Sequence, residues 1–330
     1  MSNKFSSAEV NVFLLVLILL SVVGCSLIIG DDDPRWDTNV PEGEAFDSYL
    51  GIWSPDGTKI AFQHHEPLTS PDPGLADQLW IADLETVERE MVHSGRILAA
   101  DWSPDGRWFV FHSFSDPENL FKLDVHGRHM SPLTGPNSPN PDLEYAATGD
   151  WSPDGGTILF SIVAGEPRGI SRMDPDGSKA QLLIPYGIQP DWFPDGERIA
   201  YVNWDTTLSY ATGRMRQIYT ARPDGSDTRK LTDLAESSFI STPTVSPDGR
   251  KIAFVYRGKD RSAELFLMNP DGTNVRQVTN GPGIVSRPEW HPSGEKILFG
   301  RFIPNVSRRL YVLEVGTLEV EPLFGRKIGD

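Results

Sequence analysis

A five-residue motif recurs six times along the chain, and it constrains the fold more than any other feature of the sequence. Each copy begins with an aromatic residue or Val, has Pro in the middle and ends in Gly, and an apolar segment follows it closely. The copies occupy residues 53–57, 102–106, 151–155, 192–196, 245–249 and 290–294. Their prolines are Pro55, Pro104, Pro153, Pro194, Pro247 and Pro292, which are 41 to 53 residues apart. A repeat of this length with strand-forming segments is typical of a β-propeller.

The chemistry of the motif is that of a tight turn between two antiparallel strands. In the first copy the side chain of Ser54 can bond the backbone, and Pro55 fixes φ at the second turn position. Asp56 suits the third position, and Gly57 can adopt the left-handed conformation that follows. The last copy has His291 in place of Ser, which we interpret as a structural substitution.

Each repeat also has a second half with two further strand signals. Apolar segments stand at residues 79–81, 120–123, 170–173, 218–221, 265–268 and 310–313. A turn and a short apolar segment follow each of them, as in Leu133-Thr134, Leu231-Thr232 and Val278-Thr279. The repeats therefore predict an all-β fold of six units with four antiparallel strands each, and no amphipathic helix of useful length follows Gly30.

The strings Trp-Ser-Pro-Asp-Gly with a following Ile-Ala-Phe resemble the blades of the TolB-like propeller family, a WD-repeat-like group. The resemblance covers about residues 48–324 and implies a six-bladed β-propeller. It says little about activity, because unrelated functions are built on the same fold. The chain has no Gly-x-Ser-x-Gly motif, and nothing in the sequence supports acyl-enzyme chemistry.

The first residues have the features of a bacterial lipoprotein signal. A mainly apolar run at residues 12–23 follows Lys4 and ends at Gly24-Cys25. This ending resembles a lipobox and implies cleavage before Cys25 and acylation of that residue, for example with palmitate. We expect a signal peptide over residues 1–24, an acylated Cys25 with a flexible tether over 25–47, and the propeller over 48–330. The alternative is an uncleaved anchor, because the apolar stretch continues to Gly30.

An acylated Cys25 predicts a protein held by lipid outside the cytoplasmic membrane, in the cell envelope or periplasm. Ser26 follows the cysteine, and by resemblance to enterobacterial lipoproteins this implies delivery to the outer membrane if the cell has two membranes. The formal net charge of −16 makes nucleic acid an unlikely partner. The single Cys excludes a disulfide framework and any metal site made of several cysteines. We expect a monomer.

The longer connections of a propeller are expected to bind ligands, because they lie on one face of a rigid scaffold. They are predicted at residues 63–78, 112–119, 161–168, 202–216, 255–263 and 300–308, with two more at 134–149 and 232–243. The candidate ligand residues on this face are His64, His65, His112, Trp204, Arg214, Tyr256, Arg257 and Arg301. The three histidines could meet at one rim, but their spacing is not that of a metal site. The alternative is an ordinary solvated loop face.

A second pattern lies just before the motif aromatic, on the strand expected nearest the propeller axis. Four of these six positions are acidic, namely Asp101, Asp150, Asp191 and Glu289. A ring of carboxylates on the axis could hold Ca²⁺ or Mg²⁺. The alternative interpretation is structural, with each carboxylate bonding the amides of a neighbouring turn. If the four acidic residues have this structural role, we expect the protein to bind no cofactor.

The sequence leads to a primary hypothesis and two alternatives. The primary hypothesis is a non-enzymatic envelope protein whose propeller binds a protein, a peptide or a glycan, with no catalytic residues. The first alternative is a metal-dependent propeller enzyme, such as a hydrolase, lactonase or lyase. The second alternative is a TolB-type component of an envelope complex.

Overall fold

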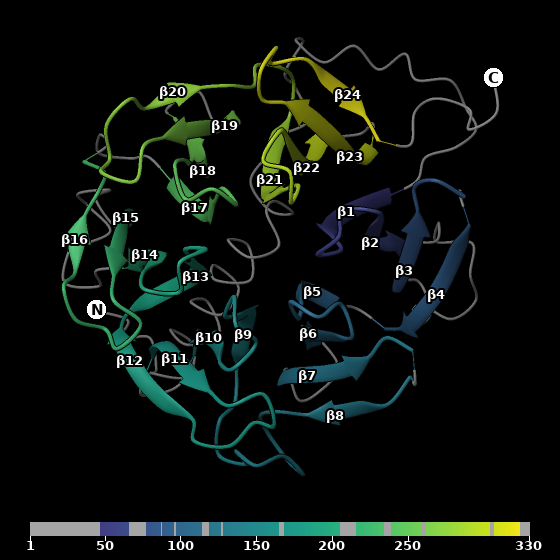
Figure 1. Cartoon of the computed structure of the whole chain (residues 1–330), viewed down its shortest axis with the longest axis vertical. Helices are drawn as coiled ribbons and strands as arrows, with labels where there is room; N and C mark the ends of the chain where they lie inside the picture. Colours follow the sequence, from purple (N-terminus) through teal and green to yellow (C-terminus); the bar gives the residue numbers. More distant parts are fainter. Residues whose placement is uncertain are drawn as a thin grey trace, which may run out of the picture.

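The repeats fold into antiparallel sheets arranged in a ring around a central axis (Figure 1). The structure is a computed structural model, and it describes residues 47–65, 77–86, 88–95, 97–113, 119–126, 128–164, 168–204, 216–233, 239–258, 262–303 and 307–323. All regular elements in these residues are β-strands. The proposed signal, the lipidation site Cys25 and the tether lie outside the described residues, except for Asp47, which begins the first strand.

Each unit runs outward from the axis through four strands, here termed A, B, C and D. The A strands lie nearest the centre of the ring (Figure 1), and they are β1 (Asp47–Trp53), β5 (Ile97–Trp102), β9 (Ala146–Trp151), β13 (Gly187–Trp192), β17 (Phe239–Val245) and β21 (Ile284–Trp290). The B strands are β2 (Lys59–His65), β6 (Trp108–Ser113), β10 (Ile158–Ile162), β14 (Ile199–Trp204), β18 (Ile252–Arg257) and β22 (Lys296–Ile303).

The outer strands complete each unit. The C strands are β3 (Asp77–Asp83), β7 (Asn119–Asp124), β11 (Gly169–Met173), β15 (Arg216–Ala221), β19 (Ala263–Met268) and β23 (Ser307–Glu314). The D strands are β4 (Arg89–Ser94), β8 (Met130–Pro132), β12 (Gln181–Pro185), β16 (Arg229–Lys230), β20 (Arg276–Gln277) and β24 (Val320–Pro322). The D strands are the edges of the sheets, and several contain only two or three residues. Short edge strands give a second chain little to pair with.

Strand pairing divides the described residues into four sheets of four strands and one sheet of eight. The eight-stranded sheet consists of β17–β20 and β21–β24, each antiparallel within itself. A single parallel bridge between Ala263 and Ile284 joins the two groups. The predicted all-β class and the four-stranded antiparallel units are therefore confirmed, and one parallel bridge joins the last two units into a single sheet.

The motif turns form through the hydrogen bonds that their residue types predict. In the third unit Ser152 Oγ donates to Asp154 Oδ1 at 2.6 Å and accepts from the Thr157 amide at 2.9 Å. The Gly155 amide donates to the Ser152 carbonyl at 2.8 Å, and Gly155 has a φ of 70°. This positive φ is the reason that glycine ends the motif.

Large apolar side chains of the B strands fill the space between neighbouring sheets. The third apolar position of each B strand is aromatic and buried, and it holds Phe62, Phe111, Phe160, Tyr201, Phe254 and Phe299. One such cluster joins the first and last units, because Trp53 and Phe62 pack with Leu298 and Leu310. Within the described residues the ring therefore closes by side-chain packing, while β1 pairs in its own unit with β2.

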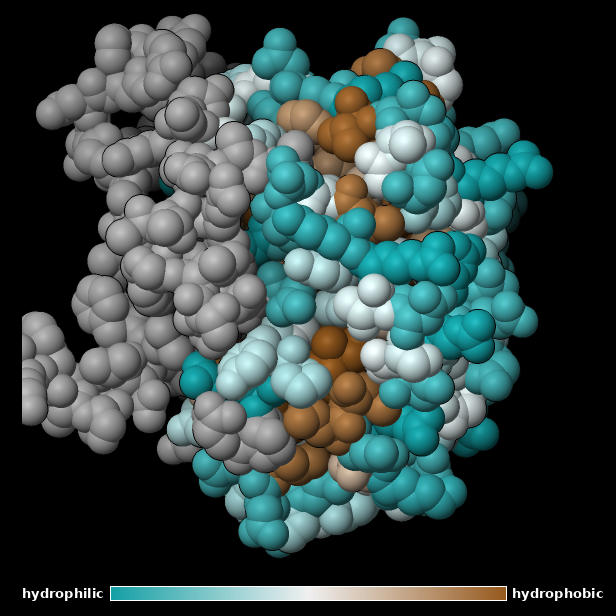
Figure 2. Space-filling view, turned by 90° about the vertical axis from the view of Figure 1, so that its left-hand side faces the viewer, coloured by the Kyte–Doolittle hydropathy of each residue, from teal (hydrophilic) through white to brown (hydrophobic). Residues whose placement is uncertain are grey.

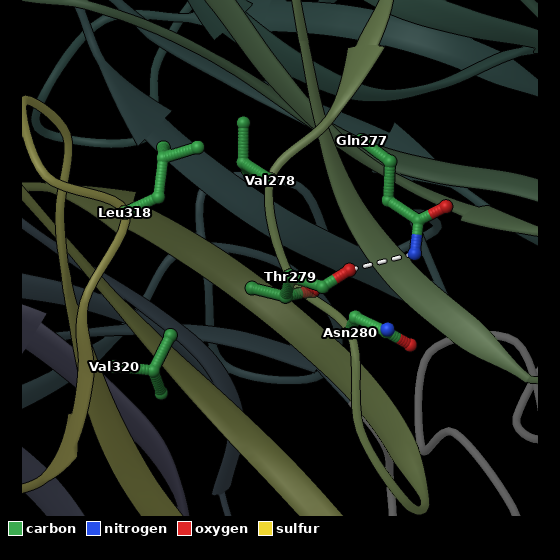
Figure 3. Close-up of a pocket in the computed structure, with 6 residues that line it drawn as sticks. All are labelled: Gln277, Val278, Thr279, Asn280, Leu318 and Val320. Carbon is green, nitrogen blue, oxygen red and sulfur yellow. Dashed lines mark hydrogen bonds between the residues drawn. The ribbon is translucent and has the colours of Figure 1, made fainter.

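The outer rim is mostly hydrophilic. Figure 2 shows the side of the ring that carries β12 and β16, where hydrophobic side chains gather only in small patches between hydrophilic ones. In the described part of the chain no helix has the length and apolar character needed to cross a membrane. The rim offers no broad apolar surface in this view. A pocket of about 520 Å³ lies between units five and six, and its lining residues are Gln277, Val278, Thr279, Asn280, Leu318 and Val320 (Figure 3).

Candidate functional site

A cavity of about 290 Å³ opens on the axis at the end of the ring that carries the Pro-Asp-Gly turns. Residues from every unit line it, because each A strand ends there. The lining includes the motif prolines except Pro194, the motif aromatics and Val245. It also includes the four carboxyl groups of Asp101, Asp150, Asp191 and Glu289. The predicted placement of these acidic residues on the innermost strand is therefore what the structure shows.

Three of the carboxyl groups link one unit to the next. Asp101 Oδ2 accepts a hydrogen bond from the Trp151 amide at 2.7 Å. Asp150 accepts from the Trp192 amide at 3.0 Å, and Asp191 accepts from the Val245 amide at 2.8 Å. Each aspartate thus holds the A strand of the following unit, which is the contact that the structural interpretation of these residues requires.

Burial raises the pKa of all four carboxyl groups, and the charges of neighbouring carboxylates raise it further for Asp150, Asp191 and Glu289. Burial raises the pKa of Asp101 and of Asp191 to about 7. Burial, followed by the charges of Asp191, Asp101 and Glu289, raises the pKa of Asp150 well above its usual value. Burial and the charges of Asp101 and Asp191 raise the pKa of Glu289 in the same direction. At neutral pH the cluster therefore holds protons and can both donate and accept hydrogen bonds.

The geometry does not fit the hypothesis of a metal on the axis. Among the residues that the structure describes, no group of three or more His, Cys, Asp or Glu side chains is arranged to hold a metal ion. One oxygen of each of three aspartates already accepts a backbone N–H. We derive no chemistry through Ca²⁺ or Mg²⁺ at this site.

The histidine candidates lie in strands and not in loops. His64 and His65 belong to β2, and His112 belongs to β6. His64 is half-buried, and His112 is buried. Burial, with a further contribution from the charge of Arg287, lowers the pKa of His112 to about 3. His112 is therefore neutral at physiological pH and cannot act there as a cation for a ligand.

The remaining ligand candidates fall in different surroundings. Tyr256 and Arg257 end β18 and are half-buried, and the ring of Tyr256 meets that of Phe266 edge to face at 5.3 Å. Trp204 ends β14, and the structure describes its backbone only. Arg214 lies outside the described residues.

Arg301 of β22 has a partner inside the protein. Its Nη2 lies 3.2 Å from Oε2 of Glu264, and both side chains are less than 10% exposed, at 8% and 6%. Oε1 of Glu264 also accepts from the Gly281 amide at 3.1 Å. The guanidinium of Arg301 therefore holds units five and six together.

The predicted loop boundaries after the B strands were too early. The loops were predicted to begin directly after the apolar triplet of each B strand, but β2 continues to His65 and β22 to Ile303. A B strand is paired on both sides, with A and with C, so backbone hydrogen bonds extend beyond its apolar core. Polar residues at its end are carried into the sheet.

The sequence did not reveal a second set of inward-facing contacts. In units three to six the A strand has a β-bulge near the position three residues before the motif aromatic or Val. The residues at that position have positive φ, and they are Thr148, Gln189, Thr242 and Arg287. Oε1 of Gln189 accepts from the Thr242 amide at 2.9 Å. The Gln189 amide donates to Ser161 Oγ at 3.0 Å. None of the four positive-φ positions holds a glycine, so residue type at these positions gave no signal for the bulges.

Comparison with known proteins gives one consistent result. The family model described as the TolB beta propeller domain matches residues 165–303. The uncharacterized protein Atu1656 of Agrobacterium fabrum is 30% identical over 269 residues, which cover 76% of this chain and 84% of that protein. The Protein TolB homolog of Chlorobium luteolum is 29% identical over 337 residues, covering 84% of this chain and 68% of that protein.

Among solved structures, TolB from Acinetobacter baumannii superposes with a TM-score of 0.67 at 21% identity. The match covers 82% of this chain and 64% of that chain. At this level of identity the similarity shows a shared fold.

Proposed function

Because the chain belongs to the TolB-like β-propeller family, we propose that it is a lipid-anchored protein of the cell envelope whose propeller binds a protein partner. The similarity to proteins named TolB supports the envelope location. The apolar run before Cys25 supports the anchor. A peptide or a glycan remains an outcome of the test below.

In this proposal the two halves of the eight-stranded sheet count as two blades. The ring is then a six-bladed propeller of 24 strands in its described residues. The single parallel bridge between Ala263 and Ile284 is a local contact between adjacent blades. Each blade supplies one A strand to the axis, so all six meet at one point.

The axial cavity is the observation that carries the proposal. Residues from every unit line the cavity, and four carboxyl groups are among them. Hydrogen bonds between units hold three of these carboxyl groups in place. Because these carboxyl groups are already held in place, binding a hydrogen-bond donor costs little conformational entropy. The partner that fits the cavity presents a Lys or Arg side chain, or a turn with free backbone N–H groups, to its mouth.

Substitutions of exposed turn prolines test this proposal. Pro104 and Pro153 stand at the cavity mouth and are exposed, so P104R with P153R blocks the mouth with two bulky cations. A matched control is P175R with P270R, because these prolines occupy Pro-Asp-Gly turns away from the axis. The tagged full chain is isolated from native membranes, and co-purified proteins are identified by mass spectrometry.

We expect one protein to co-purify with the wild type and the control variant and to fall at least about tenfold with the mouth variant. Loss from both variants alike, or no protein enriched over an untagged chain, would overturn the proposal. Retention of a peptide or glycan in place of a protein would overturn the choice of partner.

The lipid anchor has its own test. Cells are grown with an alkyne-tagged fatty acid, and label on the wild-type chain is compared with label on Cys25→Ser. We expect label on the wild type and its loss from the variant, which should also retain its signal peptide. An unlabelled wild type that stays in the membrane fraction would support the uncleaved anchor instead.

A further inference from the structure

In five of the six units, a residue at the end of the C strand or directly after it forms an ion pair or a hydrogen bond with a nearby cation. Unit four departs from this pattern. These residues are Asp83, Asp124, Asp174, Asn269 and Glu314 in units one, two, three, five and six. Their partners are Lys59 at 3.9 Å, Arg107 at 3.0 Å, Lys179 at 2.6 Å, Lys251 at 2.8 Å and Lys296 at 2.9 Å, respectively.

Unit four has an arginine at this position. Ile199 of β14 faces Ala221 of β15, so the register places Arg198 opposite Arg222, where unit six has Lys296 opposite Glu314. Arg198 turns instead to Asp195 at 3.4 Å, and its guanidinium lies 4.1 Å from the ring centre of Phe193. Within the described part of the chain Arg222 forms no ion pair. The register of unit four therefore places two like charges in positions where units one and six place opposite charges.

A groove of about 1110 Å³ lies at this point. Six cationic side chains line it, namely Arg172, Arg198, Arg222, Arg229, Lys230 and Arg250. They come from units three, four and five, so the fold brings together cations from distant parts of the sequence. This concentration of positive charge is unexpected in a chain with a formal net charge of −16.

The acidic residues of the same groove are largely engaged in other contacts. The groove includes Glu197, Asp224, Asp227 and Asp271. Asp227 lies 3.3 Å from Arg229, and Asp224 and Asp271 accept hydrogen bonds from the amides of Ser226 and Thr273 in their own turns. The charge of Arg222 helps to lower the pKa of Asp224, after the hydrogen bonds from Ser226. Six cations against four carboxylates still leave the groove with an excess of positive charge, which a bound anion would balance.

We propose that this groove binds a ligand carrying phosphate groups. The planar fork of a guanidinium matches two oxygens of a phosphate, and two arginines can share one doubly charged group. The ligand is either a soluble phosphate ester or the headgroup of a phospholipid. The groove is at the rim of the turn face and is separate from the axial cavity, with which it shares no lining residue. The proposal does not rest on the proposed function.

The test uses inorganic pyrophosphate as the probe and the full chain in a non-ionic detergent. The substitution Arg222→Asp restores the acidic residue found in other units, so Arg198 gains an internal partner and the fold should be kept. The matched control is Arg276→Asp, which makes the same charge change at an exposed residue of β20 outside the groove. Binding is measured by calorimetry at low and at physiological salt.

We expect pyrophosphate to bind the wild type and the control alike, and Arg222→Asp to weaken binding about tenfold or more. Binding should also weaken with salt, because the groove is open to solvent. No binding to the wild type, or equal weakening in both variants, would overturn the site. Equal binding of citrate would overturn the choice of phosphate.

A short-chain phosphatidylglycerol, kept below its micelle concentration, distinguishes the two sources of phosphate. Competition with pyrophosphate supports the site with a lipid headgroup as its ligand. Pyrophosphate binding that the lipid leaves unchanged supports the site with a soluble phosphate as its ligand.

Discussion

At the scale of single residues, Asp101, Asp150 and Asp191 combine two roles that conflict electrostatically. Each accepts an amide N–H from the next unit, which favours the charged form. Burial near other carboxyl groups favours the neutral form and prevails, so their pKa values are raised. The hydrogen bonds that join neighbouring units are therefore accepted by carboxyl groups that hold protons near neutral pH.

This arrangement predicts how stability depends on pH. An acid whose pKa rises from 3.8 when unfolded to about 7 when folded binds more protons in the folded state. The contribution of such a group to stability then falls as pH rises from about 4 to 7. Asp101→Asn combined with Asp191→Asn mimics two of the neutral acids, so we expect it to make this decline shallower, while Asp150 and Glu289 still contribute to it. The urea midpoint of the full chain in detergent, measured at pH 4.5, 6 and 7.5, checks this.

Buried His112 contributes the opposite trend, because its pKa is lowered. The slopes of variant and wild type must therefore be compared, and not the wild-type curve alone. Asp142→Asn is the control, since Asp142 is exposed, and it should leave the slope unchanged. A double variant that follows the wild-type slope would show that Asp101 and Asp191 do not titrate in this range.

At the scale of elements, a buried threonine attaches the end of each of three units to the start of its C strand. Thr134, Thr232 and Thr279 each accept an amide N–H from that strand, from Leu120, Ile218 and Leu265. Each hydroxyl in turn donates to the side chain just before that amide, namely Asn119, Gln217 or Glu264. The recurring Leu-Thr and Val-Thr pairs of the sequence thus have a structural cause.

Substituting Thr232 tests the strength of this attachment. The shape of the side chain is kept in Thr232→Val, but the hydrogen bonds of the Thr232 hydroxyl with the Ile218 amide and the Gln217 carboxamide are lost. We expect a loss of about 1–3 kcal/mol in the free energy of unfolding, because buried polar groups are left unsatisfied. Thr232→Ser keeps the hydroxyl and should recover most of it. If urea unfolding shows that Thr232→Ser and Thr232→Val lose the same free energy of unfolding, the effect comes from packing and not from the hydroxyl.

At the scale of the whole molecule, the described ring closes without exchanging a strand, and the last motif turn is adapted to that joint. The ring of His291 meets the ring of Trp53 edge to face with centroids 4.6 Å apart. Nε2 of His291 lies 3.3 Å from the Gly57 carbonyl oxygen. Histidine replaces the usual serine where the sixth unit touches the first, so the substitution contributes to closure.

Restoring the usual residue should weaken the joint. We expect His291→Ser to cost about 1 kcal/mol through the lost aromatic contact and to speed amide exchange in β1 more than in β13. His126→Ser, at an exposed histidine, is the control. Hydrogen exchange followed by mass spectrometry measures both strands. Equal acceleration in β1 and β13 would show that His291 stabilises the ring as a whole and not its closure.

The sequence by itself determined the β-class, the four-stranded units and the position of the four acidic residues on the axis. These features depend on local chemistry, since a Pro-Asp-Gly turn and an alternating apolar strand are set by residues close together in the chain. Only the tertiary structure decided what the side chains touch. The sequence made Arg301 a ligand candidate, but in the structure its guanidinium pairs with Glu264, a residue of the preceding unit. The facing arginines of unit four likewise required the strand register. Partners from different strands and units meet only when the sheets assemble, and sequence spacing does not record that contact.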